Sequence, residues 1–133
     1  MSDALSDVAA DTAVAGPVVV EPPVDVVLAV DVGATFFQAG LVTARGALLD
    51  LSRAPIEADV GPESNHTALA LTVNEMLERA ASRHAAVVRC LGLTSGGHVS
   101  RGLDEVTPLS VPAWTNFPLR ARLEELSALE VYG

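Results

Sequence analysis

The sequence predicts an α/β protein with a mixed sheet, in the order of three strands, a helix, a strand, a second helix and the start of a further strand. A continuous β-branched and apolar run at residues 26–30 is typical of a strand buried on both faces. Two more strand-like runs follow at 36–43 and 47–56. Residues 64–84 then carry one apolar stripe at helical spacing. A helix placed there must cross the sheet before the next strand can pair.

The first three strands are separated by turn-forming residues. The first strand ends at Asp31-Val32-Gly33-Ala34-Thr35. The second ends at Ala44-Arg45-Gly46, where glycine tolerates positive φ. Such short links join neighbouring strands, so these three are predicted to form an antiparallel meander.

The first helix is expected to begin at Ser64, an acceptable N-cap residue, and to end near His84. A buried strand is predicted at 86–93, and residues 94–98 end it in a loop of small residues. The apolar stripe of the helix consists of Leu69, Val73, Leu77 and Ala80.

A short hairpin around Gly102 is expected within residues 101–109. Asn116 is expected to cap the second helix, with Pro118 in its first turn, where a missing N–H costs little. Residues 131–132 predict the start of a fifth strand. The stripe of the second helix consists of Leu119, Leu123 and Leu126.

The composition predicts one modest core behind an acidic leading segment. Residues 1–25 are rich in Ala, Val, Asp and Pro and have no aromatic residue, so they are predicted to be disordered. Roughly 108 residues remain, enough for one core but not for two. Because half of the residues are hydrophobic and only 4% are aromatic, that core must be built from Val, Leu and Ala.

The charge and the cysteine count exclude several classes of function. The net charge is −9, all eight basic residues are Arg, and none precedes Arg45, so clustered cations for a nucleic acid or an anionic membrane are not expected. One cysteine, Cys90, excludes an internal disulfide framework. The acidic start does not resemble a secretory signal, and no apolar run reaches the length of a bilayer span. A cytoplasmic protein is expected.

The turn Asp31-x-Gly33-x-Thr35 is the first candidate binding feature. A sharp turn between two strands can aim backbone N–H groups into one concavity and hold phosphate oxygens there. Gly33 allows close approach of a ligand, and Thr35 adds a hydroxyl. A carboxylate at the end of the strand, Asp31, can hold a hydrated Mg²⁺. The alternative is a plain hairpin turn whose Asp accepts local hydrogen bonds.

The second candidate feature is the loop at 92–98, GLTSGGH, directly after a buried strand. Open α/β sheets bind ligands at such strand ends, although a flexible exit from the strand would look the same. The sequence has neither a GxxxxGK[ST] phosphate loop nor a GxGxxG fingerprint. His66, His84 and His98 are scattered without metal-ligand spacing, and Cys90 is interpreted as an inert apolar residue.

Together these features resemble the ROK family (repressors, open reading frames and sugar kinases), over residues 26–133. LAVDVGATFFQAGLV at 28–42 is similar to the family's first phosphate motif and second strand. GLTSGGHVS at 92–100 occupies the place of the G-x-x-x-P-G-P-V-D loop. SVPAWTNFPLRARLEE at 110–125 matches the N-L-P-G-W-x-x-F-P-L-x-x-x-L-E segment. The chain departs from the family pattern at Ala34, Phe36, Gly96, His98 and Ser110, where Gly, Lys, Pro, Pro and Asn are usual.

The resemblance implies a partial actin-like, RNase-H-like domain and ATP-dependent phosphorylation of a hexose, with ATP and Mg²⁺ as cofactors. It places the ATP phosphates at Asp31, Gly33, Ala34 and Thr35, with Mg²⁺ held by Asp31 through water. It places the sugar near Gly97, His98 and Ser110.

The same resemblance predicts that this chain has no catalytic residue of its own. The family's Asn-Asp pair, whose Asp takes the proton from the sugar hydroxyl, follows the strand that begins near Val131, and the chain stops before it. Residues 26–133 are therefore expected to be the N-terminal part of a hexose kinase, inactive unless a complementing chain or a second copy completes the cleft. Two alternatives stay open: a sugar-sensing module of the regulator branch, and a stand-alone interaction domain that binds no nucleotide.

Overall fold

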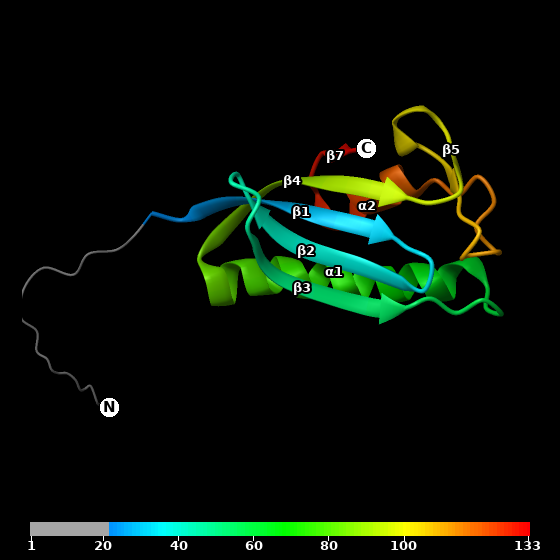
Figure 1. Cartoon of the computed structure of the whole chain (residues 1–133), viewed down its shortest axis with the longest axis horizontal. Coiled ribbons are helices and arrows are strands. Elements are labelled where there is room, and N and C mark those ends of the chain that lie inside the picture. The colour runs from blue at the N-terminus through cyan, green and yellow to red at the C-terminus, as the bar shows by residue number, and fades with distance from the viewer. Residues whose placement is uncertain (1–21) are drawn as a thin grey trace, which may run out of the picture.

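The computed structural model describes residues 22–133 (Figure 1). Most of the segment predicted to be disordered, residues 1–25, lies outside the described residues. Its last two residues do not fit that prediction, because the first strand, β1, spans Val24–Val32 and starts two residues earlier than expected. Val24 and Asp25 pair with Ala86 and Val87, so the sheet itself extends the strand toward the N-terminus.

The described chain forms a five-stranded mixed sheet in the order β3-β2-β1-β4-β7. The further strands are β2 (Phe36–Thr43), β3 (Leu48–Pro55), β4 (Ala86–Ser95) and β7 (Val131–Tyr132). β1, β2 and β3 pair antiparallel, which confirms the predicted meander. β4 pairs parallel with β1, and β7 pairs parallel with β4, so the carboxyl ends of these three strands lie at one edge.

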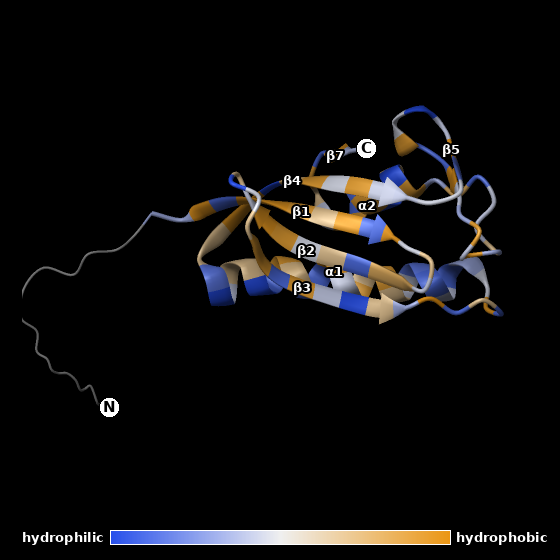
Figure 2. Ribbon diagram, in the orientation of Figure 1, coloured by the Kyte–Doolittle hydropathy of each residue, from blue (hydrophilic) through white to orange (hydrophobic). Residues whose placement is uncertain are grey.

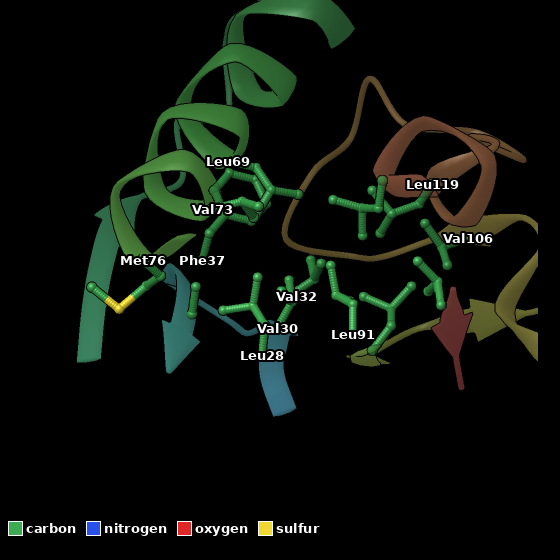
Figure 3. Packing of buried hydrophobic residues seen from close by; sticks show 14 of the residues in the cluster. Leu28, Val30, Val32, Phe37, Leu69, Val73, Met76, Leu91, Val106 and Leu119 are labelled. Carbon is green, nitrogen blue, oxygen red and sulfur yellow. The ribbon is translucent and has the colours of Figure 1, made fainter. Parts of the chain in front are cut away.

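One face of the sheet carries both helices and the core. Helix α1 (Pro62–His84) and helix α2 (Leu119–Ser127) lie behind the sheet in Figure 1. Alternate residues of β1 point toward them and are buried. The middle of β1 is apolar throughout in Figure 2, but Val27 and Ala29 on its other side are exposed, so the expected burial on both faces is wrong. Figure 3 shows this core, which includes Leu28, Val30, Val32, Phe37, Leu69, Val73, Met76, Leu91, Val106 and Leu119.

The predicted starts of both helices are wrong. α1 begins at Pro62 with Gly61 in the cap position and no side-chain cap, because proline's fixed φ suits the first helical turn. α2 begins at Leu119 with Pro118 in the cap position. Asn116 stands outside it at φ 49°, and its amide donates to Thr107 Oγ1 at 2.8 Å instead of capping the helix. The segment before α2 is thus held by a neighbouring strand.

That neighbouring strand belongs to the predicted hairpin. β5 (His98–Val99) pairs antiparallel with β6 (Val106–Thr107), and a short 3₁₀ turn, Arg101–Leu103, lies between them. Gly102 in this turn has φ +68°, which suits glycine. The hairpin follows β4 directly and places the next loop beside the end of β1, as Figure 1 shows.

The opposite face of the sheet has no covering element among the described residues. The strand register places Gly92, Ala29 and Gly40 in one row across β4, β1 and β2. Exposed apolar side chains surround this row of small residues: Val27, Leu48, Leu49, Leu51 and Tyr132. We call this surface the open face. Parallel strands are usually covered on both faces, so the open face is unusual for a sheet with this pairing.

Candidate functional site

The turn between β1 and β2 is tight and is held by backbone hydrogen bonds. The amide of Gly33 donates to the carbonyl of Phe36 at 3.0 Å, and the amide of Ile56 donates to the carbonyl of Thr35 at 2.9 Å. A Cβ placed on Gly33 would lie 3.0 Å from the Phe36 carbonyl oxygen, so glycine fits this position best. The Gly33 amide is used within the turn, whereas no backbone carbonyl in residues 22–133 accepts from the amides of Ala34 and Thr35.

The end of β4 lies directly beside this turn. Parallel pairing places Thr94 opposite Asp31 and Ser95 opposite Val32. The Thr94 hydroxyl donates to Asp31 Oδ1 at 2.6 Å. The amide of Gly96 donates to the carbonyl of Val32 at 3.3 Å. The two candidate features, more than 50 residues apart in the sequence, are therefore joined by hydrogen bonds at the carboxyl edge of the sheet.

A third segment, the loop after β6, closes the other side. The Ser110 hydroxyl donates to the carbonyl of Gly33 at 2.7 Å. Gly97 has φ +80°, and a Cβ there would lie 2.5 Å from the Thr107 carbonyl oxygen and 2.7 Å from Pro108 Cα. The loop after β6 can pack this closely against the loop after β4 only because residue 97 has no side chain.

These three segments enclose one hollow of about 570 Å³, which we call the turn hollow. It brings together five of the residues predicted to bind a ligand: Asp31, Gly33, Ala34, Gly97 and Ser110. The other two lie outside it. Thr35 is exposed on the turn, and His98 is exposed on β5. The remaining residues that line the turn hollow are Val32, Gly96 and Leu109.

Two residues of this region were not predicted to bind a ligand, although one of them, Thr94, lies in the candidate loop at 92–98. Leu109 is 91% exposed at the rim of the turn hollow, and an isolated leucine in a loop carries no pattern that would mark it. Thr94 bonds to Asp31, and the sequence did hold a signal for it. Asp31 and Thr94 each lie at the end of a predicted buried strand, and parallel neighbouring strands bring such ends together.

The groups in the turn hollow suit an oxygen-rich anion with a hydrated cation. Asp31 supplies one carboxylate, and the amide of Ala34 is free of backbone acceptors in the described residues. Mg²⁺ commonly binds through one or two carboxylates, several waters and substrate phosphates. No group of three or more His, Cys, Asp or Glu residues in 22–133 could hold a metal alone. The residues present therefore fit a cation that arrives with its phosphate.

A second hollow of about 490 Å³ lies on the open face and shares Asp31 with the turn hollow. Apart from Asp31, Gln38 and Thr94, its lining is apolar or small: Ala29, Val30, Gly40, Leu48, Leu51, Gly92, Leu93, Tyr132 and Gly133. Asp31 thus stands at the boundary between a polar edge and an apolar sheet surface. No helix within residues 22–133 is long and apolar enough to cross a membrane.

Solved structures share this fold. A ROK family glucokinase from Streptomyces griseus, in complex with glucose and AMPPNP, superposes with a TM-score of 0.63 at 21% identity, over 80% of this chain and 32% of that one. The ROK hexokinase from Thermus thermophilus has a TM-score of 0.66 at 25% identity, over 80% and 34%. A ROK family transcriptional regulator, a homologue of the Escherichia coli MLC protein, has a TM-score of 0.67 at 18% identity, over 81% and 27%.

The chain thus spans about a third of the length of these structures. A search of curated proteins found no match. The sequence profile described as the ROK family matches residues 27–132, which include all of β2, β3, β4 and both helices as well as most of β1. With the fold, the turn hollow and this match in agreement, the chain belongs to the ROK family.

Proposed function

We propose that this chain is the N-terminal part of an ATP-dependent hexose kinase and forms one wall of its cleft. The observation that carries the proposal is the turn hollow, in which Asp31, Ala34, Gly97 and Ser110 meet from three separate segments. Two similar structures, those of a glucokinase and a hexokinase, support the substrate class. A kinase that draws on ATP is expected in the cytoplasm.

In this proposal the ATP phosphates lie against the turn at Gly33, Ala34 and Thr35. Asp31 holds a hydrated Mg²⁺, which would neutralise phosphate charge when bound. The amides of Ala34 and Thr35 are the donors that remain available to phosphate oxygens, because the Gly33 amide is used within the turn. Thr35 is exposed beside them, so its hydroxyl is available to a larger ligand that extends past the turn hollow.

The hexose is assigned to the side formed by Gly97, His98 and Ser110. The hydroxyl of Ser110 has one proton, which it donates to the carbonyl of Gly33. While this bond persists, Ser110 can accept a hydrogen bond from a sugar hydroxyl but cannot donate one. Gly97 lines the hollow with backbone alone, and His98 stands further out on β5. This side therefore offers few polar groups to a sugar, and more must come from elsewhere.

The chain is proposed to be catalytically silent alone. Phosphoryl transfer needs a base on the attacking hydroxyl and groups that position the phosphates from both sides of the cleft. Among the residues that line the turn hollow, Asp31 is the one carboxylate, and its Oδ1 already accepts from Thr94. A base and a second wall are proposed to come from a complementing chain or a second copy.

The open face is the surface proposed to receive that partner. It combines small residues in its centre with exposed Leu51 and Tyr132 on either side, and it adjoins Asp31. Light scattering distinguishes the two partners. A dimer that becomes monomeric on Leu51→Asp supports a second copy, and a monomer in both cases supports a complementing chain.

The test is ATP-dependent phosphorylation of glucose and related hexoses by the purified chain. No turnover above the buffer background is expected. The same assay on a gene product extended past Gly133, or with a complementing chain added, is expected to gain activity that Asp31→Asn removes. Turnover by the chain alone would contradict the proposed silence. Binding of Mg-ATP without any phosphorylation by the extended or complemented protein would contradict the kinase assignment.

A sugar-sensing role is the second candidate, because the regulator described above shares the fold with a TM-score of 0.67. The charge of this chain disfavours direct DNA contact, since eight Arg residues stand against 17 acidic ones. A gel-shift assay at moderate salt separates the two functions. Retention of DNA would favour the regulator, and free DNA together with Mg-ATP binding would favour the kinase.

A further inference from the structure

The carboxylate of Asp31 has a defined orientation. Its Oδ1 accepts from the Thr94 hydroxyl at 2.6 Å. Its Oδ2 points to the other side, toward Gly33, where a Cβ would lie 3.4 Å from this oxygen. One oxygen is thus used within the sheet, and the other is turned toward the segment that lines the turn hollow.

The strand register explains why Thr94 can do this. Asp31 and Thr94 are direct partners in the parallel pairing of β1 with β4, and both side chains belong to the open face. Threonine is β-branched, so its side chain loses little freedom when the hydroxyl is held in one rotamer. A hydrogen bond to a charged carboxylate is also stronger than one between neutral groups. Thr94 is therefore suited to fix the carboxylate before any ligand arrives.

The neighbouring groups do not provide the same restraint. Gln38 is the partner of Asp31 on β2, but it makes no hydrogen bond to Asp31 in the described structure. Ser110 holds the carbonyl of Gly33 and so fixes the backbone of the turn, not the carboxylate. Among the described residues, Thr94 is the side chain that hydrogen-bonds to the carboxylate of Asp31.

We propose that Thr94 is a positioning residue that holds Asp31 Oδ1 so that Oδ2 is presented to the hydrated Mg²⁺ of a bound nucleotide. The inference rests on the proposed function, because it assigns Thr94 a task within the same site. It differs from a plain cross-strand contact in its consequence. A cross-strand contact contributes to stability alone, whereas a positioning contact also changes how Asp31 is ordered and how well Mg-ATP binds.

The experiment compares Thr94→Val, which keeps the shape and loses the hydroxyl, with Thr94→Ser, which keeps the hydroxyl. Thr43→Val is the matched control. Thr43 lies at the end of β2 that is far from Gln38, the residue paired with Asp31, and its hydroxyl accepts from the amide of Ala47. The first measurement is the three-bond NMR couplings across χ1 of Asp31, without ligand. The second is the affinity for Mg-ATP, by NMR titration.

In Thr94→Val the Asp31 couplings are expected to become averaged, and the Mg-ATP affinity is expected to fall by about threefold to tenfold, as for loss of one hydrogen bond to a charged group near solvent. Thr94→Ser is expected to restore both values, and Thr43→Val to change neither. Unchanged couplings in Thr94→Val would overturn the proposal. A Thr94→Ser variant as impaired as Thr94→Val would also overturn it, because the methyl group and not the hydroxyl would then matter.

The two proposals fail in different ways. If the wild-type chain does not bind Mg-ATP, the nucleotide assignment is contradicted, and the Asp31 couplings still decide whether Thr94 orders the carboxylate. If Mg-ATP binds equally well to wild type and Thr94→Val, the nucleotide assignment stands and the positioning role of Thr94 is overturned.

Discussion

His66 lies on α1 against the segment that leads into α2, and its ring is held in an unusual way. Arg122 Nη2 lies 3.2 Å from its Nδ1, and Nε2 is buried without a partner in the described residues. Its ring lies 6.0 Å from that of Phe117. Burial lowers the pKa of His66, and the Arg122 guanidinium lowers it further, while Glu63 and Glu125 oppose this change.

This arrangement predicts a pH dependence of stability. Well above pH 6.5 the imidazole is neutral in both states, so His66 contributes no pH dependence there. Below that value the unfolded chain binds a proton that folded His66 resists, so stability should fall with decreasing pH until the lowered pKa is passed. Thermal unfolding between pH 7.5 and pH 5.5 should show this loss, and His66→Gln should flatten it. An equal loss in His66→Gln would assign the effect to other groups.

Gly97 is expected to be required for the shape of the turn hollow. Gly97→Ala would force a Cβ against the Thr107 carbonyl at a φ of +80°, and strain of this kind costs about 1–3 kcal/mol. Gly96→Ala is the matched control, because a Cβ at residue 96 meets nothing within 4 Å. Urea unfolding should show the loss for residue 97 alone. Equal free energies of unfolding for Gly97→Ala and Gly96→Ala would contradict this, because the loop after β6 would then move aside without cost.

At this scale the sequence predicted which residues lie together better than it predicted their contacts. The turn from Asp31 to Thr35 was recognised because Asp and Gly have distinct backbone and charge properties. The partners of Asp31 and Gly33 are Thr94 and Ser110, which are 63 and 77 residues away. Only the pairing of β1 with β4 and the packing of the loop after β6 bring them together. Local sequence therefore could not show that Thr35 and His98 lie outside the hollow.

Among the elements, the segment before α2 joins both helices to the sheet. The indole of Trp114 is fully buried, donates from Nε1 to the carbonyl of Pro62 at 3.0 Å, and stacks on Phe117 with 4.3 Å between ring centroids. Its ring also lies 5.5 Å from that of Phe37 on β2. Pro62 is the first residue of α1, so one side chain ties the start of that helix to the approach to α2.

Trp114→Phe is expected to destabilise the fold by about 1–3 kcal/mol, because the Pro62 carbonyl loses its donor and a smaller ring leaves a cavity. Urea unfolding followed by circular dichroism measures this, since the chain's one tryptophan is lost in the variant. Phe36→Leu is the control, as Phe36 is partly exposed and stacks with Arg53. If Trp114→Phe lowered the free energy of unfolding no more than Phe36→Leu, Trp114 would not join the start of α1 to the segment before α2.

The elements themselves were largely predictable, and their starts were not. Periodicity located α1 because Leu69, Val73 and Ala80 repeat at helical spacing and all are buried. The N-caps were misassigned because Ser64 and Asn116 are residue types that commonly cap helices. In the structure the helices begin at or directly after Pro62 and Pro118, whose rings fix the backbone φ at these positions. Three hydrogen bonds to β6 hold Asn116 and Phe117 before α2 begins, and no local pattern reveals them.

At the scale of the whole described structure, residues 22–133, the two faces of the sheet differ. The covered face holds the core, and the open face leads to Asp31 at its polar edge. The sequence predicted the mixed sheet and the meander from its strand order. It did not predict which face both helices cover, because a crossing helix can be drawn on either side until handedness and packing are considered.

Binding of the ATP phosphates is proposed for the turn after β1 and the loops beside it. An NMR titration of the chain with Mg-ATP, followed by amide shifts, tests it most directly, with Asp31→Asn as the comparison. Amide shifts are expected at the turn, at Gly33, Ala34 and Thr35, and at Gly96 beside it, with much smaller ones in Asp31→Asn. A folded chain whose spectrum does not change, or changes only away from the turn after β1 and the loops beside it, would contradict this binding.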